Sequence, residues 1–182
     1  MSRIPPVDRN TTNEPVHRNF EAVQTQLGIV PNMMRTMAQS PSVLEAYLGF
    51  GAALRRGRLP ARLQEQIALA VAEINSCDYC LSAHTALGRG VGLSDEQLAA
   101  SRAASDPDPK TGAALRFVRA VVDSRGDVSD QDLARVRAVG YTDGDIAELI
   151  AHAAINVFTN YFNRAARTDI DFPVVTAGQA AA

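Results

Sequence analysis

Apolar residues recur every three or four positions along almost the whole 182-residue chain, and this spacing is typical of amphipathic helices. The pattern is clearest over residues 15–27, 41–56, 60–74 and 143–166. No segment alternates between apolar and polar residues for long enough to predict a β-strand. The sequence therefore predicts an all-α fold.

Residues that start and stop helices lie where this pattern needs them. Three of the later helices are expected to begin after a capping hydroxyl that is followed three positions later by a polar residue, at Ser94, Ser129 and Thr142. Gly126 and Gly140 occupy the position at which a left-handed residue commonly ends a helix. Residues 31–37 are expected to form a short turn.

The length and the charge of the chain limit its possible functions. At about 150 residues per domain, the chain is expected to form one domain, which we place at residues 15–173 between flexible segments at 1–14 and 174–182. The formal net charge of −2 offers no basic surface for nucleic acid or an anionic membrane. No run of 18 apolar residues predicts a transmembrane helix, and no apolar segment near Met1 predicts a secretory signal. We therefore expect a cytoplasmic protein that binds neither nucleic acid nor membranes.

Only two residues separate the two cysteines of the chain, Cys77 and Cys80. A helix capped by Asn75 or Ser76 places both cysteines in its first turns, and His84 follows one turn later on the same face. The helix dipole and a neighbouring imidazolium favour the thiolate, the form that attacks a peroxide or a disulfide. Two thiols at this spacing can then close a disulfide. The pattern predicts a redox-active pair.

Two carboxylates precede the cysteines, in the helix that is expected to begin at Pro60. An antiparallel hairpin between this helix and the cysteine helix brings Glu65 and Glu73 back toward the thiols. Glu65 has apolar neighbours and is expected to be partly buried, where a carboxylate can transfer protons near neutral pH. Glu73 is expected to face water.

One segment fixes a carboxylate, two thiols, an aromatic ring and an imidazole in a single spacing: Arg62-x-x-Glu65, then Cys77-Asp78-Tyr79-Cys80-x-x-x-His84. This motif resembles that of the AhpD-like alkylhydroperoxidase family, within the carboxymuconolactone decarboxylase superfamily. Looser similarity to its peroxidase-related subgroup extends the resemblance to most of residues 20–173.

The resemblance implies a single-domain helical bundle with the Cys-x-x-Cys motif at the N-terminus of a core helix, assembled into homo-oligomers such as trimers or hexamers. It implies that Cys80 attacks hydrogen peroxide or an organic peroxide and that Cys77 resolves the product into a disulfide. His84 and Glu65 would form the proton relay. The Cys77–Cys80 disulfide would be the only redox group, with no bound cofactor, and a thiol or a lipoyl-bearing protein would reduce it.

Other interpretations of the same residues stay open. The disulfide can serve a redox-sensing switch that binds a partner without turnover. Cys77, Cys80 and His84 also offer three zinc ligands, with Glu65 or a neighbouring subunit as the fourth. Superfamily membership alone implies decarboxylase chemistry on a lactone acid, and two cysteines can also be buried apolar side chains.

Further polar side chains receive plainer interpretations. Tyr79 is interpreted as a packing residue or a wall of the substrate pocket. His152 lies among alanines and is interpreted as structural or interfacial. Arg55, Arg56 and Arg58 are interpreted as solvated cations at a helix end, where they suit the dipole.

Overall fold

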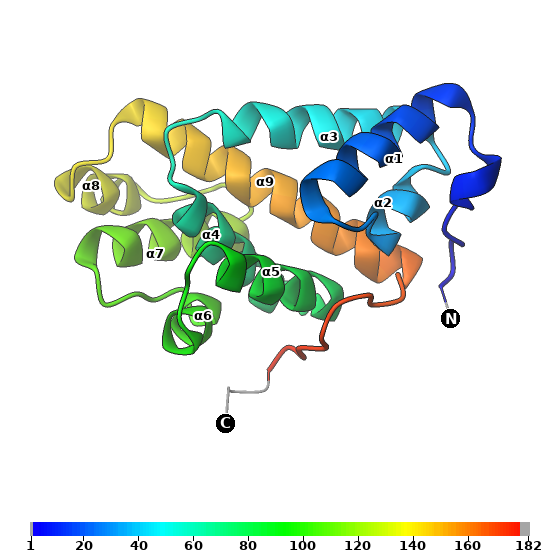
Figure 1. Ribbon diagram of the computed structural model, residues 1–182. Helices are drawn as coiled ribbons and strands as arrows, with labels where there is room; N and C mark the ends of the chain where they lie inside the picture. The colour runs from blue at the N-terminus through cyan, green and yellow to red at the C-terminus, as the bar shows by residue number, and fades with distance from the viewer. Residues whose placement is uncertain (1, 179–182) are drawn as a thin grey trace.

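The regular secondary structure of residues 2–178, the part of the chain that the computed structural model describes, is entirely helical (Figure 1). The elements in chain order are η1 (Arg9–Thr11), α1 (Glu14–Leu27), α2 (Asn32–Met37), α3 (Pro41–Arg55), α4 (Ala61–Ile74), α5 (Asp78–Gly90), α6 (Asp95–Arg102), α7 (Pro109–Asp123), α8 (Asp130–Ala138) and α9 (Asp143–Ala166). The predicted all-α fold is confirmed. Within this range, no helix has both the length and the hydropathy needed to cross a membrane.

The predicted starts of the three later helices are confirmed, and Gly140 is left-handed directly after the C-cap of α8. After α7 this position is occupied by Arg125, and Gly126 comes one residue later than expected. Ser94, Ser129 and Thr142 each form a reciprocal capping box with the residue three positions later. The expectation of a turn at residues 31–37 is wrong, because this segment contains helix α2. The methionines of α2 are all buried, so packing against the core stabilises a helix that is short on its own.

Helix α4 lies at the centre of the molecule. Its residues 69–72 are completely buried on every side, as expected for a helix that is apolar all round. It packs against α5, α6, α7 and α9. One apolar cluster joins it to α1, α2, α3 and α5, and a second joins it to α7, α8 and α9. Side chains on α4 are therefore held by contacts on both sides.

A tight link of three residues turns α4 into α5. Asn75 ends α4, Ser76 is left-handed with φ of 50°, and Cys77 caps α5. Arg164 of α9 fixes the link by donating a hydrogen bond to the carbonyl of Asn75. Helix α5 begins at Asp78, so the expectation that Asn75 or Ser76 would cap it is wrong. Both residues are used to reverse the chain, and Cys77 is the first one free to cap.

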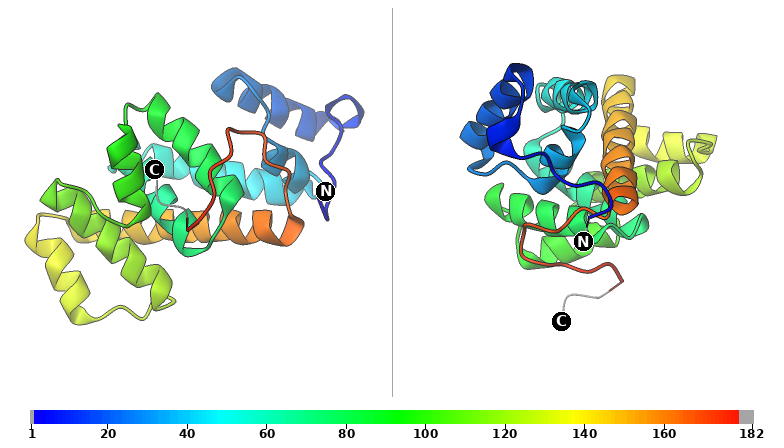
Figure 2. Two further views of the ribbon diagram at one scale, coloured as in Figure 1. Left: turned by 90° about the horizontal axis from the view of Figure 1, so that it is seen from below. Right: turned by 90° about the vertical axis from the view of Figure 1, so that its right-hand side faces the viewer.

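The segment after α9 crosses the N-terminal half of α5 (Figure 2). Val175 donates its N–H to Ser82 Oγ at 2.9 Å, and Ala177 donates its N–H to Asp78 Oδ1, in the first turn of α5, at 2.9 Å. Val175 and Ala177, in the tail that was expected to be flexible, are therefore hydrogen-bonded to α5, while 179–182 lie outside the described residues. The domain limits of 15 and 173 stay predictions.

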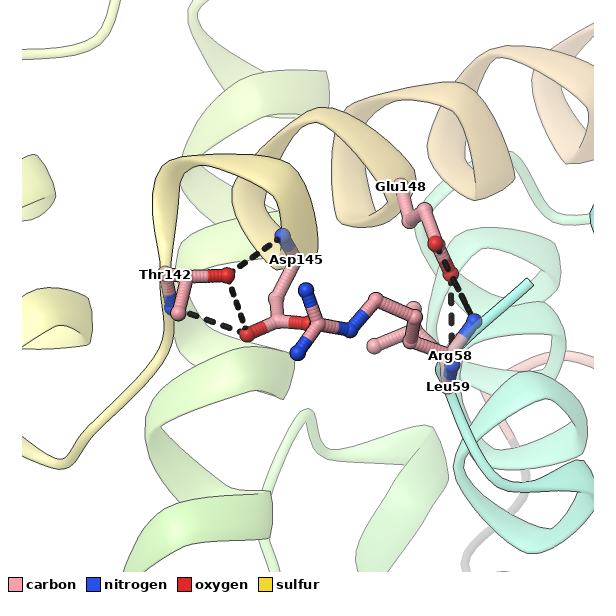
Figure 3. Close-up of polar contacts among 5 residues, drawn as sticks. All are labelled: Arg58, Leu59, Thr142, Asp145 and Glu148. Carbon is pink, nitrogen blue, oxygen red and sulfur yellow. Dashed lines mark hydrogen bonds and ion pairs between the residues drawn. The ribbon is translucent and has the colours of Figure 1, made fainter.

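The connection between α3 and α4 is held against the first turns of α9 (Figure 3). The Glu148 carboxylate accepts the N–H of Arg58 at 2.8 Å and that of Leu59 at 3.2 Å. The guanidinium of Arg58 lies 3.5 Å from the carboxylate of Asp145, which also closes the Thr142 cap. These contacts set where α3 ends and α4 begins relative to α9.

Replacing Glu148 by alanine is expected to lower the free energy of unfolding by about 1–2 kcal/mol, because two backbone N–H groups lose their acceptor. Glu148→Gln keeps an acceptor oxygen and should cost less. Urea unfolding monitored by circular dichroism measures both. Arg119→Gln is the surface control, since its ion pair with Asp123 is half exposed and should change stability by less than about 0.5 kcal/mol. Equal losses for Glu148→Ala and Arg119→Gln would contradict this role of Glu148.

Candidate active site

Cys77 and Cys80 lie at the buried N-terminus of α5. Both are free thiols, and they are only 1% and 2% exposed. The Sγ of Cys77 accepts the backbone N–H of Cys80 at 3.3 Å, so the thiol itself caps the helix. This bond places the Cys77 side chain within the first turn, next to Cys80.

The two thiols have opposite pKa shifts. The side-chain hydrogen bond with Cys77 lowers the pKa of Cys80 to about 7 against the opposing effect of burial, and the charge of His84 and the amide of Asn163 add to the lowering. The pKa of Cys77 is raised by the same hydrogen bond and by burial. Cys80 therefore carries the negative charge, while Cys77 keeps its proton and donates it.

His84 and Glu65 form an ion pair beside the thiols, across the α4–α5 hairpin. His84 Nδ1 lies 2.8 Å from Glu65 Oε2. Burial opposes a charged imidazole, but the Glu65 carboxylate outweighs it, and the pKa of His84 is raised. Because an ionised carboxylate only accepts hydrogen bonds, Nδ1 carries a hydrogen and Nε2 is the nitrogen that can exchange protons with a substrate.

Cys80, His84 and Glu65 line one cavity of about 470 Å³. This volume falls within the range of about 300–1,000 Å³ that is typical of small-molecule sites. Most of the lining is apolar and comes from six helices and the C-terminal segment, including Leu27, Met33, Leu54, Leu87, Ile155 and Phe172. The cavity is much larger than hydrogen peroxide requires, so it has room for an organic substrate.

Two asparagines of α9 that the sequence analysis did not select lie against Cys80. Asn163 Nδ2 donates to Cys80 Sγ at 3.4 Å, and the amide of Asn160 also lowers the pKa of that thiol. Asn160 Oδ1 accepts from Asn75 at 3.0 Å. The spacing of three residues between Asn160 and Asn163 places both amides on one face of α9, and this is the sequence signal that could have selected them.

Tyr79 and Glu73, two other residues considered from the sequence, also make specific side-chain contacts. Tyr79 lines the cavity; its hydroxyl accepts the N–H of Met33 at 3.1 Å, and its ring meets Phe172 edge-on. The expectation that Glu73 faces water is wrong. Its carboxylate lies 2.8 Å from Arg102 Nε, since α6 packs across the end of α4 and brings the guanidinium to it.

The cavity also includes polar residues that the sequence analysis placed elsewhere. His152 is buried and lines the cavity from α9, and Arg55, which is exposed to solvent, lines it from α3. Tyr47 of α3, which the sequence analysis did not select, lines it as well. Within residues 2–178, no three His, Cys, Asp or Glu side chains gather into a group that could hold a metal ion.

Residues 41–123 match the profile of the carboxymuconolactone decarboxylase family. The matched segment is a little under half of the chain, so the similarity to this family is reported for these residues. The "alkylhydroperoxidase AhpD core", an uncharacterized peroxidase-related protein from Ralstonia eutropha JMP134, has the same fold, with a TM-score of 0.83 and 27% identity over 93% of this chain and 92% of that one. The resemblance to AhpD-like proteins is thereby confirmed.

Two further proteins are similar to this chain. The debrominase Bmp8 shares its fold, with a TM-score of 0.79 and 22% identity over 92% of this chain and 91% of that one. An uncharacterized protein of Haemophilus influenzae (strain Rd) is 49% identical over 47 residues, which are 25% of this chain and 42% of that protein. The matched segment thus spans less than half of the Haemophilus protein.

Proposed function

We propose that the chain is a thiol-dependent peroxidase of the alkylhydroperoxidase type. The observation that carries this proposal is the pairing of a low-pKa Cys80 with a protonated Cys77. The thiolate lies in an organic-sized cavity that the His84–Glu65 pair also lines. In this proposal Cys80 is the nucleophile, Cys77 is the resolving thiol and His84 is the proton donor.

The proposed reaction has two steps. The Cys80 thiolate attacks the terminal oxygen of ROOH, the S–O bond forms, the O–O bond breaks, and the leaving alkoxide takes a proton from His84 Nε2. The products are ROH and Cys80 sulfenic acid. The sulfur of Cys77 then attacks the sulfenic sulfur, a disulfide forms, and hydroxide leaves as water with the proton of Cys77.

The disulfide must be reduced before another turnover. Two electrons from a thiol or a lipoyl-bearing protein suffice, and no bound cofactor enters the cycle. We place this cycle in the cytoplasm, where thiols are kept reduced.

We also propose a homo-oligomer, a trimer or a hexamer. Large apolar side chains of α3 and α9 support it, because Phe50, Phe158 and Tyr161 are 41%, 41% and 60% exposed. Sedimentation velocity measures the stoichiometry directly, and a monomer at micromolar concentration would exclude this part of the proposal.

Adding one equivalent of peroxide to the reduced protein is expected to remove both free thiols of each chain. With excess dithiothreitol, peroxide consumption should continue through many turnovers. Thiol counting with a chromogenic disulfide and peroxide depletion measure the two results. Stoichiometric oxidation without turnover would favour the redox-switch alternative, and unchanged thiols would exclude both.

A second candidate function is reductive dehalogenation of an aromatic compound. It is favoured by the large apolar cavity together with the fold of Bmp8, a cysteine-to-alanine variant of which was solved with 2,3,4-tribromopyrrole. In this reaction the Cys80 thiolate would take bromine from the ring, the ring carbon would gain a proton, and Cys77 would displace bromide as the disulfide forms. Release of one bromide per disulfide from a bromopyrrole separates this activity from peroxide reduction.

A further inference from the structure

The Cys80 cavity is also lined by two polar residues that the proposed peroxide chemistry does not use. Arg55, in the last turn of α3, and His152, in the first half of α9, both line the cavity. A Cβ placed on Gly51 would lie 3.2 Å from Arg55 Nη1 and 3.9 Å from Ile155 Cδ1. The Arg55 guanidinium therefore folds back along α3 over Gly51, which has no side chain. This side of α3 faces Ile155 of α9, which lies one turn after His152.

The imidazole of His152 is buried without a protein partner. Its side chain is only 5% exposed, and its Nε2 has no hydrogen bond among the described residues. Burial lowers the pKa of His152, so the ring is neutral and can donate one N–H while its other nitrogen accepts. Buried polar groups are normally satisfied, so His152, which lines the cavity, has hydrogen-bonding capacity that the described residues do not use.

Arg55 is exposed to solvent where it lines the cavity, and its charge is not paired within the protein. No described residue forms a hydrogen bond or an ion pair with its guanidinium. The acidic groups nearby are committed, because Glu65 pairs with His84 and Glu148 accepts the backbone of the α3–α4 connection. Tyr47, which also lines the cavity, is neutral, since burial raises its pKa to about 12. The cavity therefore joins an unpaired cation to a mainly apolar wall.

We propose that Arg55 and His152 bind the carboxylate of an apolar acid, so that the substrates reduced at Cys80 are aliphatic hydroperoxides that carry a carboxylate. A guanidinium presents two parallel N–H donors that match a carboxylate, and the neutral ring of His152 adds a third donor. The apolar lining then holds the hydrocarbon chain. The choice of substrate rests on the proposed function, but binding of the acid can be measured without turnover.

Calorimetric titration of the reduced protein with decanoate and with 1-decanol tests the carboxylate directly. Decanoate is expected to bind about tenfold more tightly than 1-decanol, because only the acid satisfies both polar residues. Arg55→Gln should weaken decanoate binding by about fivefold and leave 1-decanol unchanged. Arg56→Gln is the matched control, since this neighbouring arginine does not line the cavity and should change neither Kd.

His152→Phe separates a binding role from a structural one. It is expected to weaken decanoate binding by about tenfold while the melting temperature stays level or rises, because an unsatisfied buried group is removed. A structural role for His152 would instead lower the melting temperature and leave the preference for decanoate over 1-decanol intact, which would overturn its assignment to the site.

Separate measurements test where the acid binds and whether the protein reduces peroxide. Decanoate should slow alkylation of Cys80 by iodoacetamide in the wild type and do so less in Arg55→Gln. Equal affinity for decanoate and 1-decanol, or equal effects of Arg55→Gln and Arg56→Gln, would overturn the inference even if cumene hydroperoxide, a neutral substrate, is still reduced. If Arg55-dependent binding is found but no peroxide is reduced, the acid site stands and the proposed function falls.

Discussion

Replacing Cys80 by serine is expected to lower kcat/KM for peroxide by at least about 10³-fold, to the rate of the uncatalysed reaction. A serine hydroxyl is not ionised at neutral pH, whereas the pKa of Cys80 is lowered to about 7 and about half of the thiol is already thiolate there. Peroxide depletion in the presence of dithiothreitol measures the loss. Wild-type turnover by Cys80→Ser would remove Cys80 from its proposed role as nucleophile.

Variants of Cys77 separate the two proposed steps, which are the attack on the peroxide and the formation of the disulfide. Cys77→Ser keeps a donor for the Cys80 thiolate, so the first attack should remain and stop at a sulfenic acid that dimedone traps. Cys77→Ala removes the donor and should in addition raise the pKa of Cys80, because the hydrogen bond from Cys77 is the largest contribution to its lowering. Rates of iodoacetamide alkylation against pH give that pKa. Loss of all reaction in Cys77→Ser with a retained first step in Cys80→Ser would reverse the two assignments.

The local parts of this site could be predicted from sequence because they depend on spacing along one hairpin. Glu65 and His84 are nineteen residues apart, and the short link at residues 75–77 keeps α4 and α5 packed side by side. The same holds for the capping boxes at Ser94 and Ser129, which need only four consecutive residues.

The wall of the cavity could not be predicted in the same way. His152 reads as an isolated histidine among alanines, and only the packing of α9 against α3 and α4 gives it a cavity to line. Arg55 belongs to a basic run with Arg56, and the sequence cannot separate the two. In the structure the two differ, because Arg55 folds over Gly51 and lines the cavity, whereas Arg56 does not line it.

Exchanging Glu65 for glutamine is expected to lower kcat/KM for peroxide by about 10²-fold at pH 7, the smaller end of the range for general acid–base groups. The glutamine remains close to His84 but removes the charge that raises the pKa of the imidazole. His84 therefore loses its proton at a lower pH, and less of it is available to protonate the leaving alkoxide. Glu73→Gln is the matched control on the same helix, since Glu73 pairs with Arg102 outside the cavity.

The pH profile shows whether Glu65 acts through this relay. In the wild type, kcat/KM should rise with pH through about 7, because only the thiolate of Cys80 attacks and its fraction grows as pH exceeds its pKa. The positive charge of His84 contributes to that low pKa, so a ring that is neutral in Glu65→Gln supports the thiolate less and the pKa of Cys80 goes up. The rising limb must then move to higher pH, and His84→Gln should move it in the same direction.

Because both residues act as one unit, the double variant should be little slower than either single variant. A midpoint that stays near pH 7 in Glu65→Gln, or losses that multiply in the double variant, would show that Glu65 and His84 act independently of each other.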